Sequence, residues 1–522
     1  MNRGNFNIEV ALDNKKGYVR FIAINMLIGI LIYLTMISQH LTNHYEGLWT
    51  DPYFNAGIRE VYFGQWFCPF IDRLRMGYGG DPFNSYLSLL YFVLGNLFLL
   101  DTFAFIGKKK AYLFSAMILA STTISACLSY RYMSPTFGLS YFFSIVAVWI
   151  LYKVEKTLKS IFFSGTLLCL SLGLYQANLG CSCLLIIGVM FVLCFETDTN
   201  KWLRFLIKSI LSILFACILY RIIWDLELKF FHITVNPYSD ADRMSVSLII
   251  QKFPDRFAKS YSEFYKYFFT NSIKHSIFQH PIFYGSVFFL ILLLLLQKVC
   301  ELFKKAYYWQ LILECLGIIL IPPACNISVI LVTESDFLIQ QTAAMAILLP
   351  VLLCMLCKLW ECFPKNCSML EHLAIGMAAL LLYGNVYMTA IDLEVMHEGR
   401  TSSEALMHHI VDTIIDNKLY GENRVYLFLG RPSDNPLFVK TQLWDKANNY
   451  ARYGEIWVGS DLSRKAYDGL LRNIGVDLLI GPDIVYDVYT VLDEIKNMPL
   501  YPSHGSILEI DDYVFIKISD TY

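Results

Sequence analysis

The sequence predicts a polytopic α-helical membrane protein of about eleven spans, with a C-terminal α/β domain outside the membrane. Hydrophobic residues make up 56% of the 522 residues, and charged residues only 16%, compared with about 25% in an average soluble domain. The apolar residues are gathered in blocks long enough to cross hydrocarbon, whereas the end of the chain has ordinary charge density. These three observations set the fold class.

The apolar blocks are each roughly 16–24 residues long, which is the length a membrane helix requires. The apolar run around Tyr175 is long enough for two spans, and "LYQANLG" predicts the reversal between them. Pro322 and Pro323 interrupt the ninth block, and a break there needs protein or a cavity around it. The predicted spans are 21–38, 86–106, 111–128, 137–152, 160–176, 178–195, 205–224, 282–298, 309–332, 337–357 and 370–388.

Lysine and arginine in the short loops predict the orientation. If eleven spans alternate, the basic loops all fall on one side, and basic loops mark the cytoplasm. The N-terminus is then cytoplasmic and the C-terminal domain extracytoplasmic. The residues that set this side are Lys15, Lys16, Arg20, Lys108, Lys109, Lys110, Lys153, Lys156, Lys159, Lys201, Arg204, Lys298, Lys304, Lys305, Lys358 and Lys365.

The chain divides into three predicted parts. Residues 1–20 form a cytoplasmic N-terminus, residues 21–388 form the transmembrane domain, and residues 389–522 form the extracytoplasmic domain. Two long loops, 39–85 and 225–281, face outward. The second loop has aromatic and charged residues at helical spacing, which is typical either of a helix lying at the membrane interface or of a solvated loop with short packing helices.

The C-terminal part carries the turn signals of a small α/β domain. "VYLFLG" and "VDLLIG" are β-rich runs that end in glycine, and "LSRKAYDGLLRNIG" has a helix cap at Ser463 and a stop at Gly475. The last strands are predicted as a hairpin turning at Asp511 and Asp512. No glycine-rich phosphate-binding motif follows a strand.

Composition excludes several functions. The net charge is −2 and no basic domain is present, which argues against nucleic-acid binding. Of 14 cysteines, many lie inside apolar runs, where cysteine acts as a small hydrophobe. Cys181 and Cys183 have neither a second pair nor a nearby histidine, so no zinc site is predicted. No cofactor is predicted, and a divalent cation bound through carboxylates has no motif to support it.

Three classes of function fit such a protein: a transferase acting on a lipid-linked substrate, a transporter or flippase, and a structural or sensory protein. A transporter needs charged groups near the bilayer midplane. Here the span centres are almost free of charge, since Asp101, Arg221 and Glu314 lie near span ends. Charge collects in the loops instead, which favours the transferase.

The loop from Leu41 to Arg75 combines the groups that sugar transfer from a polyprenyl-phosphate carrier needs. A carboxylate must take the proton of the attacking hydroxyl. Cations must hold the phosphate and offset the charge that develops as it leaves. Aromatic side chains stack on sugars. The alternative interpretation is a set of interfacial anchors and ion pairs.

Three stretches resemble the bacterial type II glucosyltransferase family, which includes the serotype-converting O-antigen glucosyltransferases. They are "LTNHYEGLWTDPYFNAGIREVYFGQWFCPFIDRLRMG", "SYRYMSPTFGLSYFFSIVAV" and "SLGLYQANLGC", and the tail "NMPLYPSHGSILEIDDYVFIKIS" is similar to the family's C-terminal end. The resemblance covers most of the chain. It implies a GT-C type fold with a catalytic acid in the first outward loop.

The resemblance implies roles for the acids of that loop. Glu46 stands where relatives typically carry an aspartate, and it is the expected general base, against the alternative of a loop ion pair. Glu60 matches a recurrent glutamate and is a second catalytic or orienting acid, or else a surface ion pair. Asp51 is a third candidate acid, or a turn residue before Pro52. Gln65 replaces an expected arginine.

Because Gln65 stands where the family has an arginine, three other arginines are candidates for holding the donor phosphate. Arg73 and Arg75 lie on one segment with Asp72, so an internal salt bridge is the alternative. Arg131 lies at a span junction, where an interfacial side chain is the alternative. Tyr175 and Gln176 at the helical reversal are candidate substrate contacts, with a polar cap between two helices as the alternative.

The sequence therefore predicts a hexosyltransferase of the bacterial cytoplasmic membrane. It moves a hexose, glucose by resemblance, from a polyprenyl-phosphate donor such as undecaprenyl phosphate to a cell-surface glycan at the outer face. The expected partners are this donor, the glycan acceptor and membrane lipid, with no nucleic acid. A lipid-linked oligosaccharide flippase is the second candidate, and a catalytically silent scaffold is the third.

Overall fold

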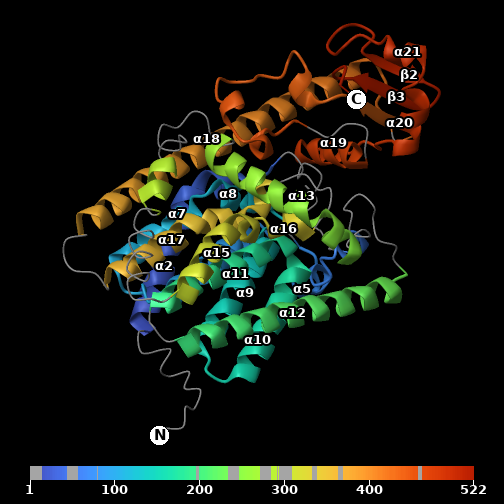
Figure 1. Ribbon diagram of the computed structural model, residues 1–522. Coiled ribbons are helices and arrows are strands. Elements are labelled where there is room, and N and C mark those ends of the chain that lie inside the picture. The colour runs from blue at the N-terminus through green and yellow to red at the C-terminus, as the bar shows by residue number, and fades with distance from the viewer. Residues whose placement is uncertain are drawn as a thin grey trace.

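The computed structural model is mostly helical and describes residues 15–43, 57–78, 80–195, 199–232, 246–270, 284–290, 292, 308–331, 338–361, 368–421, 423–455 and 461–521. Figure 1 shows a helical region with an orange-to-red C-terminal region beyond one end of it, and α18 connects the two. In the described residues, six helices are long and apolar enough to cross a membrane: Phe83–Thr102, Ser134–Lys153, Thr157–Leu174, Gln176–Cys194, Asn200–Phe230 and His372–Asp416.

Most predicted spans coincide with helices. The helical region contains α2 (Lys15–Ile32), α3 (Leu34–Gln39), α4 (Ile58–Tyr62), α5 (Cys68–Leu74), α6 (Phe83–Thr102), α7 (Lys109–Leu119), α8 (Thr122–Ser129), α9 (Ser134–Lys153), α10 (Thr157–Leu174), η2 (Gln176–Asn178), α11 (Leu179–Phe195), α12 (Thr199–Phe230), α13 (Val246–Tyr265), η5 (Lys266–Thr270), α15 (Tyr308–Cys325), α16 (Ile327–Leu331), η7 (Ile339–Gln341), α17 (Ala343–Glu361) and α18 (Ser368–Asp416).

The predicted number of eleven spans stays a prediction. The bent pair α7 and α8 raises the six candidates to seven if it counts as one span. The predicted spans 21–38 and 309–332 are each divided between two helices, and α17 is among the shorter apolar helices. Of the predicted span 282–298, only residues 284–290 and 292 are described.

The bend of 54° between α7 and α8 is supported by side chains from other helices. The Tyr33 hydroxyl donates to the Leu119 carbonyl at 2.7 Å, and the Thr389 hydroxyl donates to the Ala120 carbonyl at 3.3 Å. Ser121 caps the N-terminus of α8 through Ile124 N–H. A broken helix inside a bundle leaves carbonyls unpaired, and here neighbouring helices satisfy them.

Serines hold α9 close to α10 and α11. The Ser171 hydroxyl donates to the Ser140 carbonyl, and the Ser182 hydroxyl donates to the Ser144 carbonyl, both at 2.9 Å. All four residues are buried. Small polar residues let helix backbones approach and provide hydrogen bonds in an apolar interior, so this sequence pattern fixes the centre of the bundle.

The C-terminal region has a three-stranded sheet of order β1-β3-β2, with β1 (Val425–Leu429), β2 (Ile507–Ile510) and β3 (Tyr513–Lys517). β1 and β3 are parallel, and β2 and β3 form the predicted hairpin. Tyr426 and Phe428 pack with α18 and α19 (Asp461–Asn473), whereas Leu427 and Leu429 pack on the other face. The short helices of this region are η9 (Pro432–Asp434), η10 (Trp444–Lys446), η11 (Asn449–Ala451), α20 (Asp483–Tyr489) and α21 (Asp493–Lys496).

Two polar anchors join this region to the bundle. Asp392, which is fully buried, accepts hydrogen bonds from Asn448 N–H, the Asn448 side-chain amide and the Tyr450 hydroxyl. Arg400 donates to the carbonyls of Gln39 and His40 at the end of α3. α18 carries both anchors and runs unbroken through residue 389, where the sequence places the domain boundary. The status of residues 389–522 as a separate domain stays a prediction.

We expect Asp392→Ala to destabilise the protein by about 3 kcal/mol, because it leaves a buried hydroxyl and two N–H donors without an acceptor. The measurement is thermal unfolding of the detergent-purified protein. Glu394→Ala is the matched control, since Glu394 is exposed two residues away on the same helix. Equal unfolding temperatures for the two variants would contradict the anchor role of Asp392.

Candidate functional site

The predicted catalytic loop enters the described structure as a platform, by which we mean residues 57–78 with α4 and α5. Trp224 of α12 donates to the Val61 carbonyl at 2.8 Å, and the Tyr220 hydroxyl donates to the Gly64 carbonyl at 3.0 Å. The Gln176 side-chain amide donates to the Phe63 carbonyl at 2.7 Å. Three side chains thus bind three carbonyls of one turn, and the platform is held firmly against α12 and η2.

Two glycines allow this close approach. Gly64 has φ +75°, and a Cβ there would lie 2.2 Å from the Tyr220 hydroxyl oxygen. A Cβ on Gly173 would lie 2.5 Å from the Trp66 ring, and Phe67 N–H donates to the Gly173 carbonyl at 2.8 Å. Only glycine has the backbone freedom and the missing side chain that both conditions require.

Glu60 is buried within the platform, with 5% of its surface exposed. Its Oε2 accepts the Gly57 N–H at 2.7 Å, which ties the first turn of α4 together. Its carbonyl accepts the N–H groups of Phe63 and Gln65. Glu60 is therefore a buried acid of the platform, one oxygen of its carboxylate binds the local backbone, and its catalytic role stays a prediction.

Asp72 and Arg75 form the internal salt bridge that the sequence offered as an alternative. Arg75 Nη2 lies 2.8 Å from Asp72 Oδ1, and the Asp72 side chain is almost completely buried. Arg75 Nε is buried and has no acceptor among the described residues. Arg75 Nη2 is also buried without a geometrically defined hydrogen bond, so Asp72 and Arg75 are held by charge.

Cys68 lies in the same segment as these charged groups, and its thiol is unreactive. Burial raises the pKa of its thiol well above the usual range; the carboxylates of Asp72 and Glu60 raise it further, and Arg75 opposes them. The thiol donates to the Leu174 carbonyl at 3.5 Å. Because a thiolate is the reactive form of cysteine, Cys68 is a structural residue of the platform.

Arg73 differs from the other two arginines. It is exposed near the end of α5, and its charge acts on the carboxylate of Glu227 in α12. Arg131 instead forms an ion pair with Asp81. Of the three predicted phosphate ligands, Arg73 is the most accessible from solvent.

Tyr175 and Gln176 occupy the predicted reversal between α10 and α11. The Tyr175 ring packs edge-on against Phe137 with centroids 4.7 Å apart, and the ring of Tyr130, next to Arg131, packs against Phe137 as well. Gln176 binds the platform. These two adjacent residues therefore link the platform to the segment that carries Arg131.

Glu46 and Asp51 lie outside the described residues, and their catalytic roles stay predictions. Asn43 is the last described residue before them. Its N–H and side-chain amide donate to the carbonyl and hydroxyl oxygens of Ser129, two residues before Arg131. The stretch that carries Glu46 therefore departs from a fixed point near Arg131 and returns at Gly57 of the platform.

Sequence reasoning missed the contribution of α12. Tyr220, Trp224 and Glu227 are spaced at i, i+4 and i+7, which places them on one helix face. That spacing is visible in the sequence, but the sequence predicts a span that ends at residue 224 and puts Glu227 in the outward loop 225–281, whereas α12 continues to Phe230. At 32 residues and 1.5 Å per residue, α12 is about 48 Å long, which is more than the roughly 30 Å of a bilayer's hydrocarbon core.

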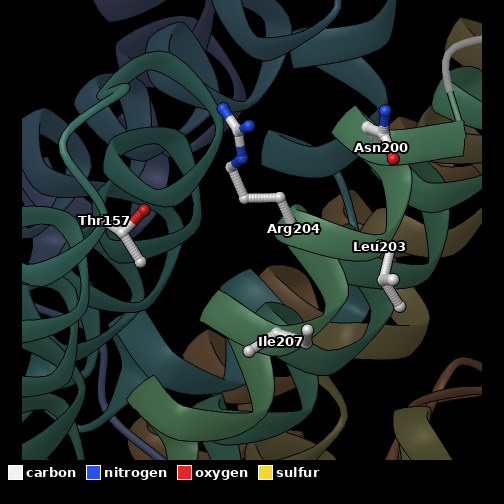
Figure 2. A pocket seen from close by; sticks show the side chains of 5 residues that line it. All are labelled: Thr157, Asn200, Leu203, Arg204 and Ile207. Carbon is white, nitrogen blue, oxygen red and sulfur yellow. The ribbon is translucent and has the colours of Figure 1, made fainter.

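A cavity of about 290 Å³ lies at the opposite end of α12. Figure 2 shows its lining side chains: Thr157 at the start of α10, with Asn200, Leu203, Arg204 and Ile207 from α12. Arg204 and Trp224 are twenty residues apart on one helix, or about 30 Å. This cavity is therefore separate from the platform. Among the described residues, no three His, Cys, Asp or Glu side chains are grouped to hold a metal ion.

The fold and the site define a helical protein with several helices long and apolar enough to cross a membrane, and with a charged platform held against one of them. Residues 52–353 match the family model described as glucosyl transferase GtrII, which is more than half of the chain. The chain belongs to this family, as the resemblance predicted, and this membership supports glycosyl transfer as its activity. No similar curated protein and no similar solved structure was found.

We expect Gly64→Ala to lower the apparent unfolding temperature by several degrees. The new methyl group meets the Tyr220 hydroxyl, and the positive φ is unfavourable for alanine by about 1 kcal/mol or more. Gly80→Ala is the control, because a Cβ there meets nothing within 4 Å. Thermal unfolding of both variants tests the clamp. A Gly64 variant as stable as the Gly80 variant would show that the turn is loosely held.

Proposed function

We propose that the protein transfers a hexose, glucose by family resemblance, from a polyprenyl-phosphate donor to a cell-surface glycan at the outer face of the bacterial cytoplasmic membrane. The observation that carries this proposal is the clamped platform in a member of the GtrII family. Hydrogen bonds at three carbonyls hold the described part of the charged loop, which carries Glu60, Asp72 and Arg75, and transfer chemistry requires such positioning.

The proposed reaction is a displacement at the anomeric carbon. The acceptor hydroxyl oxygen forms a bond to that carbon, and the bond from the carbon to the phosphate oxygen breaks. The electron pair leaves with the polyprenyl phosphate, and Glu46 takes the hydroxyl proton. The positive charges of Arg73 and Arg75 stabilise the departing phosphate.

The other acids have supporting roles in this proposal. Glu60 closes the Gly57 turn through its hydrogen bond and so orients the chain that carries Glu46 and Asp51. Arg131, held by Asp81, contributes positive potential near Asn43. Tyr175 and Gln176 link the platform to the segment that carries Arg131. No step of the proposed reaction uses a cofactor.

The proposed topology places the platform and the C-terminal region outside the cytoplasm. The support is the distribution of lysine and arginine in the short loops. Arg204 and Lys201 lie at the start of α12, and the platform contacts its end. A helix that crosses the membrane once separates these two ends, which agrees with a basic inner side and an outer platform.

We expect Glu46→Gln to reduce transfer by at least 100-fold, because the amide cannot accept the hydroxyl proton. The assay uses purified protein, labelled undecaprenyl-phosphate glucose and cell-envelope acceptor. Equal transfer by wild type and variant would exclude Glu46 as the base. Movement of the lipid across liposomes without any transfer would instead support a flippase.

We expect Arg73→Ala to affect mainly donor binding and Arg75→Ala to affect mainly the stability of the protein. Loss of Arg73 removes an exposed charge, so KM for the donor should rise about tenfold with little change in unfolding temperature. Loss of Arg75 removes the salt bridge of the buried Asp72 carboxylate, which should lower the unfolding temperature. Both are measured on the same preparations, and the reverse pattern would contradict the assignment.

A further inference from the structure

Glu227 is a carboxylate whose local bonding differs from that of its neighbours on the platform. Glu60 binds Gly57, Asp72 binds Arg75, and Asp81 binds Arg131. Glu227 has one carboxylate oxygen, Oε2, that is buried and has no hydrogen-bond partner among the described residues. No motif in the sequence distinguishes Glu227 from the other acids.

The position of Glu227 places this oxygen at the platform. Glu227 follows Trp224 by one turn of α12, and Trp224 binds the Val61 carbonyl of α4. The guanidinium of Arg73 at the end of α5 lies within electrostatic range of the Glu227 carboxylate. Two separate helices thus supply a carboxylate and an exposed cation whose charges interact.

A buried carboxylate oxygen without a donor is unfavourable for folding. Most buried polar atoms in folded proteins are paired, so an unpaired one needs an explanation. Glu227 as a residue is partly exposed, so a change of its side-chain rotamer is the movement that would present Oε2 to a ligand. A ligand that supplies hydroxyl donors would satisfy the oxygen, and a sugar does so.

We propose that Glu227 is a sugar-binding residue that accepts hydrogen bonds from hydroxyl groups of the donor hexose, next to a phosphate held by Arg73. This inference rests on the proposed function, because it takes the donor to be a hexose on a polyprenyl phosphate. It adds a carboxylate from α12, outside the first loop, as the group that distinguishes the sugar-bearing lipid from the bare carrier.

The experiment compares binding of radiolabelled undecaprenyl-phosphate glucose and radiolabelled undecaprenyl phosphate by scintillation proximity. The variants are Glu227→Gln and the control Asp225→Asn, which changes the same charge on α12 in an exposed pair with Arg221. Glu227→Gln should weaken binding of the glucose lipid by about 30-fold, the loss of charged hydrogen bonds, and leave the bare lipid unchanged. Asp225→Asn should match wild type.

Thermal unfolding separates this role from a structural one. Since Oε2 has no partner, Glu227→Gln should keep or raise the unfolding temperature. A lower unfolding temperature with weaker binding of both lipids would show a structural carboxylate and overturn the inference. Unchanged preference for the glucose lipid in Glu227→Gln would overturn it as well.

Transfer assays on the same preparations distinguish the two proposals. If wild type transfers glucose and Glu227→Gln keeps full selectivity, the sugar-binding inference fails and the proposed function stands. If wild type binds the glucose lipid through Glu227 but transfers nothing, the inference stands and the transferase proposal fails. If wild type binds neither lipid, both fail.

Discussion

The hydrogen bonds from α12 and η2 to the α4 turn are the interactions on which the site depends. Tyr220, Trp224 and Gln176 each donate to a platform carbonyl. These contacts fix a loop of high aromatic and charge content to helices of the bundle. A platform attached to rigid elements keeps its charged groups within the narrow geometry that catalysis or binding needs. A free loop with the same residues would not.

Side chains also donate hydrogen bonds to backbone carbonyls deeper in the bundle. Tyr33 and Thr389 bind the carbonyls that the α7–α8 bend releases, and paired serines hold α9 against its neighbours. In an apolar environment an unsatisfied backbone group costs several kcal/mol. The bundle tolerates bends and close packing because side chains from distant parts of the chain satisfy these groups. Against this background, Glu227 Oε2 is the one carboxylate oxygen among the buried side-chain atoms that lack a hydrogen-bond partner in the described residues.

Several features were predictable because they depend on local pattern. Hydropathy located most helices, proline and glycine marked the interruptions, and alternating β-rich runs located β1 and the final hairpin. The family was predictable from the order of its motifs. The number of spans was harder to predict, since hydropathy does not distinguish one long helix from two short ones. α18 shows the difficulty, because it continues for 49 residues through the expected boundary.

The sequence by itself determined a helical, membrane-type protein of a glucosyl transferase family with a charged early loop. Only the tertiary structure decided which charges in that loop pair with one another. Arg75 and Arg131 form ion pairs with acids, whereas Arg73 lies exposed near Glu227 from a helix about 150 residues later in the sequence. Pairing depends on distance in space, and residues far apart along the chain become neighbours only when the helices pack.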